Sequence, residues 1–494
     1  MQSTALRSER SRAVFFSYNR NQDVKMLFQL ICIASFFMVN PVIAPSDSMN
    51  SLRTAENSAV CSERCDQIHP VVAHNYSEYQ RLDYSRFSGK KRDENSETGP
   101  VEKRNRLYDI LNLYERDIVR MSGRLYFDAA YVNQANEKIE SDIESVERVT
   151  NSEFGTLVRS ARLRAEGAIT SKTRWRAEME VIDRLFTFRG FFIQYNYRDN
   201  IQFLFGNIIK EPMGIERMSP LGWYPFLELA PSVGTFMPDR NLSFRAEYRR
   251  QRFSLMVSVL SGVESIYDSA ARSGYAIAGR SAYAPFVTEH YWLHIGGHGA
   301  VRVNALATLS SNIASKYEPL VLSTRSGSRA AGIPVVGVLP IEDVRTVNRY
   351  GADFAFGYGR LYTQYEWTGV LLNRDVNHST LNLGGYYLQS GYFLTDDRRP
   401  YRPSQGNFGP VHPRKPFIGG RGTGAVEIAI RYSDTRTNDR DYRGGDIRQL
   451  AFALNWYLDS DTRLMLNYVL HNSERMDGLT YNGNVFAIRL NFEF

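Results

Sequence analysis

From about Arg120 to Phe494, apolar and polar residues alternate along the chain with a period of two. The last stretch shows this most clearly: one set holds Phe486, Ile488, Leu490, Phe492 and Phe494, and the other holds Ala487, Arg489, Asn491 and Glu493. Successive side chains of a β-strand point to opposite faces, so the pattern predicts strands with one apolar and one polar face. A soluble β-sandwich also alternates, but Tyr and Trp at the strand ends beside a face of Arg, Glu, Gln and Asn favour a transmembrane barrel.

The composition agrees with such a barrel and disagrees with a helical membrane protein. Aromatic residues make up 13% and charged residues 23% of the 494 residues. In a barrel every spanning strand turns one face to water, so half of the membrane residues can be polar. At roughly 23 residues for each strand and its connection, residues 120–494 would hold about sixteen strands. We therefore predict an all-β, transmembrane antiparallel barrel of about that size, which encloses a water-filled channel.

The first 44 residues have the pattern of a cleaved export signal. An apolar core, residues 26–39, follows Lys25 and precedes the small-residue site Val42-Ile-Ala44. The core is too short to span a bilayer as a helix. A buried hydrophobic segment is the alternative, and Met26 is a second candidate for the start of translation. Residues 45–119 are polar and predict a flexible arm, with a short amphipathic helix near Leu107–Tyr114.

Charge and cysteine content narrow the classes of partner. Lys and Arg number 60 against 53 Asp and Glu, a net charge of +7, which favours anionic partners. No helix-turn-helix, zinc-ligand or ribonucleoprotein pattern accompanies this charge, so we do not expect nucleic-acid binding. Cys32 lies in the predicted signal peptide, and a disulfide between Cys61 and Cys65 is plausible in an oxidising compartment. Two cysteines without close histidines complete no metal site, and no cofactor is expected.

Three patterns that could indicate catalysis or ligand binding have simpler interpretations. Gly420–Ala425 fits a loose dinucleotide fingerprint, but an alternating strand follows where a helix should begin. His294 and His298 could share one face of a strand, without a third ligand at metal spacing. The 8 histidines form no cluster with a Gly-x-Ser-x-Gly elbow. We therefore predict no enzyme activity, and a surface protein selected for adhesion through its long loops remains the rival hypothesis.

Several segments resemble the phosphate-selective porin O and P family. The segment Phe205–Arg217 (FGNIIKEPMGIER) looks like the family's "FG…KEPFGLE" motif, and Val158–Gly167 is similar to its early "RRARLGFEG" strand. Further blocks run from Tyr350 to Glu366 and from Gly385 to Thr395, and order and spacing agree over residues 120–494. The terminal Phe494 resembles the signal by which the barrel assembly machinery recognises its substrates.

The resemblance implies a sixteen-stranded barrel of the bacterial outer membrane, usually a homotrimer, whose third extracellular loop folds inward and narrows the pore. Carried onto this sequence, that loop is Lys210 to about Asp239, with Arg217 at the end of its motif, and Arg159 is a basic position of the early strand. The expected partners are small anions such as phosphate, outer-membrane lipid and lipopolysaccharide. Residues 304–346 depart from the phosphate-selective pattern because they offer few cations, among them Lys316, Arg325 and Arg329, so a general porin remains open.

Alternation places further arginines on the water face. Arg162 and Arg164 lie opposite Ala161, Leu163 and Ala165, and Arg245 lies opposite Phe244 and Ala246. Arginine is permanently charged and offers a fork for anion oxygens, so these side chains are candidate pore residues together with Lys210, Arg217 and Arg159. The alternative for each is a wall charge paired with a carboxylate such as Glu166, Glu178 or Glu247. Residues 249–252 are expected to form a periplasmic turn.

Overall fold

The computed structural model describes most of the chain from Val119 onward. The described residues are 119–138, 147–182, 185–207, 210–238, 241–261, 274–304, 317, 319–325, 327–330, 334–336, 340–375, 377–474 and 480–494. All of them belong to one compact unit, Glu97–Phe494. The predicted signal peptide (1–44), the cysteine pair and the predicted helix near 107–114 lie outside the described residues, as does the predicted arm except for Val119.

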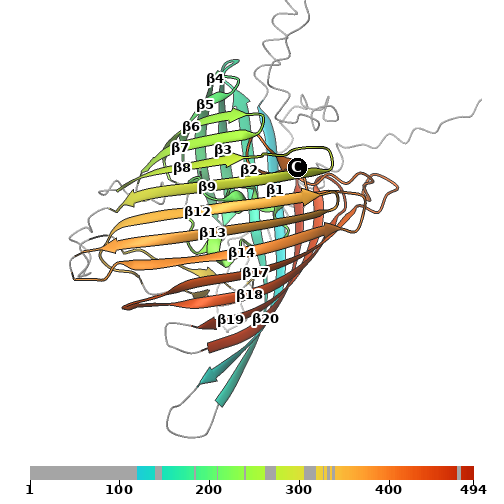
Figure 1. Cartoon of the computed structure of the whole chain (residues 1–494). Coiled ribbons are helices and arrows are strands. Elements are labelled where there is room, and N and C mark those ends of the chain that lie inside the picture. Colours follow the sequence, from blue (N-terminus) through green and yellow to red (C-terminus); the bar gives the residue numbers. More distant parts are fainter. Residues whose placement is uncertain are drawn as a thin grey trace, which may run out of the picture. The chain divides into compact units, whose positions relative to one another are not determined.

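Sixteen antiparallel strands form a closed barrel in which each strand pairs with the next along the chain (Figure 1). They are β1 Arg120–Lys138, β2 Glu147–Ala168, β3 Thr173–Ile182, β4 Leu185–Arg198, β5 Ile201–Gly206, β6 Ser243–Arg250, β7 Phe253–Ser261, β8 Tyr275–Tyr283, β9 Tyr291–Val303, β12 Val344–Tyr358, β13 Leu361–Arg374, β14 Leu381–Phe393, β17 Ala425–Asp439, β18 Tyr442–Tyr457, β19 Thr462–Glu474 and β20 Thr480–Glu493. The predicted fold class and strand number are confirmed.

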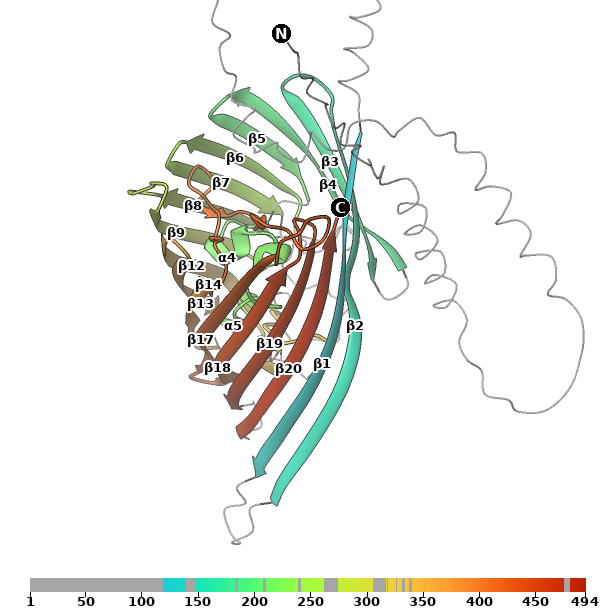
Figure 2. The same ribbon diagram turned by 90° about the vertical axis from the view of Figure 1, so that its right-hand side faces the viewer.

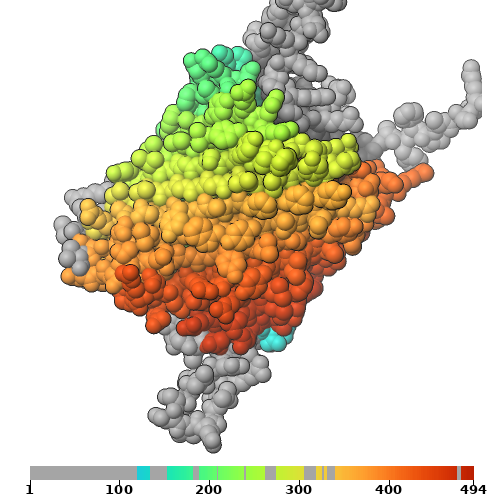
Figure 3. Space-filling view, in the orientation of Figure 1, coloured from blue at the N-terminus to red at the C-terminus, as the bar shows by residue number. Residues whose placement is uncertain are grey.

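The barrel closes between its first and last strands, and the predicted alternation decides which face meets lipid. β1 pairs with β20 from Arg124 opposite Glu493 to Glu137 opposite Thr480. The outward Phe486 and Leu490 are exposed, whereas Arg489 between them in sequence is buried inside the barrel. In the space-filling view the strands follow one another as adjacent bands of colour, from yellow through orange to red (Figure 3).

The two ends of the barrel differ in the length of their connections. At the end where β1 starts and β20 finishes, most connections are short, such as 199–200, 251–252 and 359–360. Short turns mark the periplasmic end of an outer-membrane barrel. Exposed aromatic side chains gather on the outward face near this end, as an interfacial girdle requires: Tyr195, Tyr197, Tyr283, Tyr291, Tyr358 and Tyr392. The predicted turn at 249–252 lies at this end, although Arg249 and Arg250 still belong to β6.

The strands extend further at the extracellular end than the sequence pattern suggested. The apolar alternation stops near Leu470 and resumes at Phe486, yet β19 continues to Glu474 and β20 starts at Thr480. The outward positions of this extension carry Asn472, Asn482 and Asn484 instead of apolar residues. Backbone pairing continues beyond the apolar band, because polar side chains are compatible with a strand that projects into the headgroup region and water.

The remaining elements are short and belong to three long connections. Between β5 and β6 lie α4 Ile215–Met218, the 3-10 turn η3 Leu221–Trp223 and α5 Pro231–Gly234; between β9 and β12 lie β10 Thr324–Arg325 and β11 Pro334–Val336; between β14 and β17 lie β15 Tyr401–Arg402 and β16 Asn407–Phe408. In the part of the chain that is described, no helix has the length and apolarity needed to cross a bilayer.

Phe494 closes the barrel seam, so its replacement should impair assembly. Its N–H donates to Gly123 O at 3.0 Å, and Gly123 N–H donates to Phe494 O at 2.7 Å. A Cβ on Gly123 would lie 2.5 Å from the Phe494 ring, so the glycine makes room for it. We expect Phe494→Asp to reduce the amount of folded barrel in the outer membrane several-fold, as measured by heat-modifiable migration on gels. An unchanged amount of folded barrel would contradict this, and Phe286→Asp, at an exposed aromatic residue away from the seam, is the control.

Candidate functional site: the barrel lumen

The connection between β5 and β6, residues 207–242, folds into the barrel, and we call it the inward loop. It is the third connection at the extracellular end, where the family resemblance places it, and its helices α4 and α5 lie within the ring of strands (Figure 2). Its contacts reach every barrel strand from β8 round to β20. They include Met213 O with Arg280, Glu211 with Arg302 and Arg349, Glu216 N with Glu366, Ser232 against Gly385, Glu216 with Arg431, Pro225 O with Asn455, Tyr224 O with Arg463, and Leu227 O with Arg489.

A second segment enters the lumen from the periplasmic end. It is part of the long β14–β17 connection, and we call residues 397–412 the inserted segment. Asn407 Nδ2 donates to Met218 O at 3.1 Å, and Phe408 packs against Ile215 of α4. Tyr401 stacks on Trp292 with ring centroids 4.6 Å apart. The two segments therefore meet inside the barrel and together cover the wall formed by β8, β9 and β12 to β14.

A polar cluster lies under the meeting point of these two segments. Arg280 donates to Asp353 at 2.7 Å, and His294 lies between Asp353 at 2.5 Å and the Tyr401 hydroxyl at 2.7 Å. Arg280 also donates to Met213 O in the inward loop and to Gly406 O in the inserted segment. Among the residues that are described, no group of three or more His, Cys, Asp or Glu side chains is arranged to hold a metal ion. The cluster thus joins the wall to both inserted parts.

In the described part of the chain, the inward loop and the inserted segment leave most of the wall from β2 to β6 uncovered, although Glu228 reaches Arg159 and Lys210 O reaches Arg245. This wall, which we call the open wall, is rich in arginine. Among the described inward-facing side chains of its strands between residues 159 and 249, eight arginines stand against four glutamates: Arg159, Arg162, Arg164, Arg174, Arg176, Arg189, Arg245 and Arg249 against Glu166, Glu178, Glu180 and Glu247. The carboxylates are shared. Glu180 contacts Arg124, Arg162 and Arg189, and Glu178 contacts Arg162 and Arg164. Cations therefore outnumber the carboxylates available to neutralise them.

Exposure distinguishes part of the open wall from the covered wall, although Arg162 and Arg245 of the open wall are only 7% and 5% exposed. On the open wall, the side chains of Arg164 and Arg189 are 36% and 38% exposed. On the covered wall, those of Arg280 and Arg431 are 1% and 4% exposed. The exposed fraction shows which guanidinium groups a solute can approach. An arginine side chain that is buried behind the inward loop has no water contact that an anion could replace. The exposed arginines of β2 to β4 are therefore the candidate solute contacts.

Arg217 and Lys210 belong to the internal structure of the inward loop. Arg217 is 9% exposed, and its Nη2 donates to Pro238 O at 2.9 Å, which joins the two halves of the loop. Lys210 Nζ donates to Arg217 O at 2.9 Å and to Ser219 O at 3.0 Å, at the end of α4. Backbone carbonyls at a helix C-terminus attract a cation. The family motif thus locates the loop, while its basic residues hold the loop's shape.

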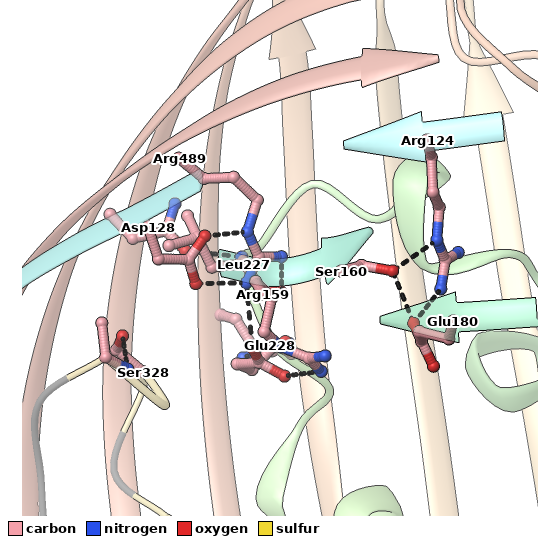
Figure 4. A network of polar contacts seen from close by, with 12 residues as sticks. Arg124, Asp128, Arg159, Ser160, Glu180, Leu227, Glu228, Ser328 and Arg489 are labelled. Carbon is pink, nitrogen blue, oxygen red and sulfur yellow. Dashed lines mark hydrogen bonds and ion pairs between the residues drawn. The ribbon is translucent and has the colours of Figure 1, made fainter. Parts of the chain in front are cut away.

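Arg159 ties the tip of the inward loop to the wall. It makes two hydrogen bonds to Glu228, at 2.6 and 3.0 Å. Arg489 of β20 reaches the same carboxylate at 2.9 Å and also pairs with Asp128 of β1 at 2.6 and 2.7 Å. Figure 4 shows Arg489 between Asp128 and Glu228, with Arg159 on the other side of Glu228. One loop carboxylate therefore bridges two strands on either side of the closing seam.

The other three candidate pore residues, Arg162, Arg164 and Arg245, each lie near a carboxylate. This is the arrangement expected of a wall charge that is paired within the barrel. Arg162 pairs with Glu178 at 3.0 Å and with Glu180 at 2.9 Å. Arg164 pairs with Glu178 at 3.1 Å but keeps an exposed side chain. Arg245 lies near Glu247 at 3.4 Å, donates to Ser258 at 2.9 Å and contacts Lys210 O of the inward loop.

Sequence reasoning left out several residues of the lumen. They are Arg174, Arg176, Arg189 and Arg249 on the open wall, Arg124 of β1 beside it, and Glu228 and Arg489 at the tip of the inward loop. Alternation alone could have found Arg174 and Arg176, which occupy the same face as Glu178 and Glu180 in β3. Arg189 escapes such a count because a register shift occurs beside it: Glu178 pairs with Gly190 and Met179 with Phe188.

Two acidic residues of the inward loop have shifted pKa values of opposite sign. Burial raises the pKa of Glu216 to about 7, although Arg431 at 3.2 Å acts in the opposite direction. For Glu228, burial alone would raise the pKa, but attraction to Arg159 and Arg489 outweighs it and lowers the pKa to about 2. Glu228 therefore stays ionised at all physiological pH values, whereas Glu216 titrates near neutrality.

The raised pKa of Glu216 makes loop docking weaken as the pH rises from acidic to neutral values. The docked loop holds this proton more tightly than a free loop does, so docking is unaffected below the ordinary glutamate pKa and weakens as pH rises through about 7. Ionisation places a buried negative charge close to the polar side chain of Glu366, which accepts the Glu216 N–H at 3.1 Å. We expect single-channel current fluctuations to become several times more frequent between about pH 5 and pH 8, and Glu216→Gln to remove that dependence. Equal pH dependence in both proteins would show that another group is responsible.

The chain is similar to a known porin family and to several outer-membrane channels. The family described as phosphate-selective porin O and P matches residues 134–494. An uncharacterized protein of Caulobacter vibrioides is 26% identical over 391 residues, which are 76% of this chain and 74% of that protein. Among solved structures, Pseudomonas putida OprB aligns with a TM-score of 0.46 and 10% identity, over 78% of this chain and 96% of OprB. The anion-selective porin of Comamonas acidovorans aligns with a TM-score of 0.44 and 13% identity, over 76% of this chain and 100% of that porin.

The family match extends over far more than half of the chain and includes all the barrel strands except the first part of β1. The protein is therefore a porin of the bacterial outer membrane and belongs to the phosphate-selective porin O and P family.

Proposed function

We propose that this porin conducts small anions and that they pass along the open wall of β2 to β6. The observation that carries the proposal is the twofold excess of arginine over glutamate between residues 159 and 249 of that wall, with four arginine side chains between 23% and 38% exposed. Exposed guanidiniums in a narrow water-filled passage attract anions, and contacts that are shared with wall carboxylates stay weak enough for release.

We propose a general preference for anions over a dedicated phosphate site. The β9–β12 connection offers few cations, and Arg329, one of its three, is exposed with Ser328 and Ala330 beside it. On the open wall each exposed arginine already has a carboxylate neighbour, for example Arg164 with Glu178 and Arg189 with Glu180. A phosphate ion would have to compete with these carboxylates for the same guanidinium groups. We therefore expect chloride and small organic anions to pass as well as phosphate.

Channel recordings in planar bilayers test the proposal. In a potassium chloride gradient the reversal potential should have the sign of an anion-preferring channel, and addition of phosphate should reduce the chloride current only at concentrations comparable to chloride. A cation preference would overturn the proposed function. Saturating block by micromolar phosphate would be compatible with anion conduction. It would, however, show that the channel has a dedicated phosphate site.

We further propose that the barrel assembles as a homotrimer, as the family resemblance implies. The supporting observation is the large outward apolar face of the barrel, which a neighbouring copy can share with lipid. Mass measurement of the detergent-extracted protein before and after heating tests this. A species of three chains that dissociates on heating is expected, and a monomer under mild extraction would contradict it.

A further inference from the structure

The β14–β17 connection, residues 394–424, is unusually long for the periplasmic end. The inserted segment accounts for 397–412, and the remainder returns to the outside of the barrel at its rim (Figure 1, in orange). We call residues 413–423 the rim loop. It lies beside Trp456, which points outward from β18, and the Phe417 and Trp456 rings are 5.1 Å apart. The rim loop therefore continues the aromatic girdle where the barrel wall leaves the membrane.

Hydrogen bonds give the rim loop a defined shape. The N–H groups of Phe417 and Ile418 donate to Leu458 O at 2.7 and 3.3 Å, which attaches the loop to the β18–β19 turn. Gly424 N–H donates to Lys415 O at 2.9 Å and closes the loop on itself. Trp456 Nε1 donates to Thr423 O at 2.8 Å. The loop thus presents its tip in a fixed position relative to the girdle.

The tip combines exposed apolar and basic side chains. Phe417 and Ile418 are 49% and 46% exposed although they are large and apolar. Lys415 and Arg421 flank them and are exposed. Arg414 is exposed as well and pairs with Asp396 at 3.0 Å. Exposed apolar side chains next to exposed basic ones, at the rim of a membrane barrel, fit an occupant that is apolar beneath and anionic at its surface.

We propose that the rim loop binds anionic phospholipids of the inner leaflet, with Phe417 and Ile418 among the acyl chains and Lys415 and Arg421 at the phosphodiester headgroups. Aromatic residues of a barrel mark the depth of the headgroups, and basic residues next to them attract anionic lipid. The position at the end of the short turns selects the phospholipid leaflet over the outer leaflet. The lipid contact also fixes the periplasmic end of the inserted segment, because the inserted segment and the rim loop belong to the same connection.

Native mass spectrometry of the full-length barrel tests the proposal. The protein is reconstituted in nanodiscs of phosphatidylglycerol and phosphatidylethanolamine and released into mild detergent, and the phosphatidylglycerol molecules retained on each barrel are counted. The test variant is Lys415→Gln/Arg421→Gln. The matched control is Arg443→Gln/Arg448→Gln, which removes two exposed charges at the opposite end. Phe417→Ser/Ile418→Ser separates the apolar contribution, and heat-modifiable migration verifies that each barrel is folded.

We expect retained phosphatidylglycerol to fall several-fold in Lys415→Gln/Arg421→Gln and in Phe417→Ser/Ile418→Ser and to stay at the parent level in the control. Equal retention in all proteins, or a loss only in the control, overturns the proposal. A parallel arm with lipopolysaccharide identifies the lipid source: if rim-loop variants lose lipopolysaccharide instead of phosphatidylglycerol, the assignment to the inner leaflet is wrong. Channel selectivity plays no part in this readout, so its failure leaves the proposed anion conduction untouched.

Discussion

Arg489→Met should lower the free energy of unfolding of the barrel by about 3–5 kcal/mol, because it leaves Asp128 charged, buried and without its partner. Arg489 and Asp128 face each other across the seam where β20 meets β1, and two hydrogen bonds of 2.6 and 2.7 Å join them. Urea unfolding in detergent, followed by the loss of the fast-migrating folded form, measures the change. No decrease in stability would show that the seam does not depend on this pair.

The double variant Asp128→Asn/Arg489→Met separates the seam from the inward loop. Removing both charges should recover most of the stability, since an uncharged pair has a much smaller desolvation cost. The inward loop still loses the donor to Leu227 O and one of the two guanidiniums on Glu228. The double variant should therefore be stable but show larger current fluctuations than the parent. A stable double variant with parental current noise would mean that Arg489 does not hold the loop.

Arg164→Glu should shift the reversal potential strongly toward cations. A unit charge about 4 Å from an ion contributes about 1 kcal/mol in bulk water and about 4 kcal/mol at an effective dielectric constant near 20. Each 1.4 kcal/mol corresponds to about a tenfold ratio, so charge reversal at one exposed site should change the anion-to-cation permeability ratio on the order of tenfold. Arg164 is suited to this test because its side chain is 36% exposed on the open wall.

Arg448→Glu is the matched control for that variant. It makes the same charge change on a side chain that is 61% exposed but lies on the outward face near the extracellular end. Salt screens such a charge from the lumen beyond about 10 Å, so the reversal potential should stay near the parental value. Arg217→Glu should act differently from both, because it breaks the bond to Pro238 O and disturbs the loop. A shift in Arg448→Glu as large as in Arg164→Glu would disprove the proposed path.

The strands could be predicted because the alternation of apolar and polar residues depends only on residues that are neighbours in the sequence. In β20, the apolar set ending in Phe494 gave the outward face, and the same rule put Arg489 inside. The extent of β19 and β20 could not be predicted, because apolarity marks only the membrane-embedded part while backbone pairing continues through Asn472 and Asn482. Periodicity shows which face a residue takes and leaves the strand end undetermined.

The site was predictable to a smaller degree, since its geometry depends on contacts between distant segments. The motif at Phe205–Arg217 located the inward loop, but the exposure of Arg217 depends on Pro238, which folds back on it. The inserted segment was not predicted at all. Its residues Tyr401 and Phe408 look like ordinary loop aromatics until Trp292 and Ile215 are placed against them. The covering of one wall, which decides the solute path, arises from these long-range contacts.

Cysteine modification in the open channel tests the location and the charge of the path together. Gln194→Cys places a thiol on the open wall in β4, and Gln389→Cys places one on the covered wall in β14, where the parent side chain is 2% exposed. In a background with Cys61 and Cys65 replaced by serine, each variant is treated with an anionic or a cationic methanethiosulfonate reagent while current is recorded. We expect Gln194→Cys to lose current, faster with the anionic reagent, and Gln389→Cys to be unaffected. Equal modification at Gln389→Cys, or faster reaction of Gln194→Cys with the cationic reagent, would contradict it.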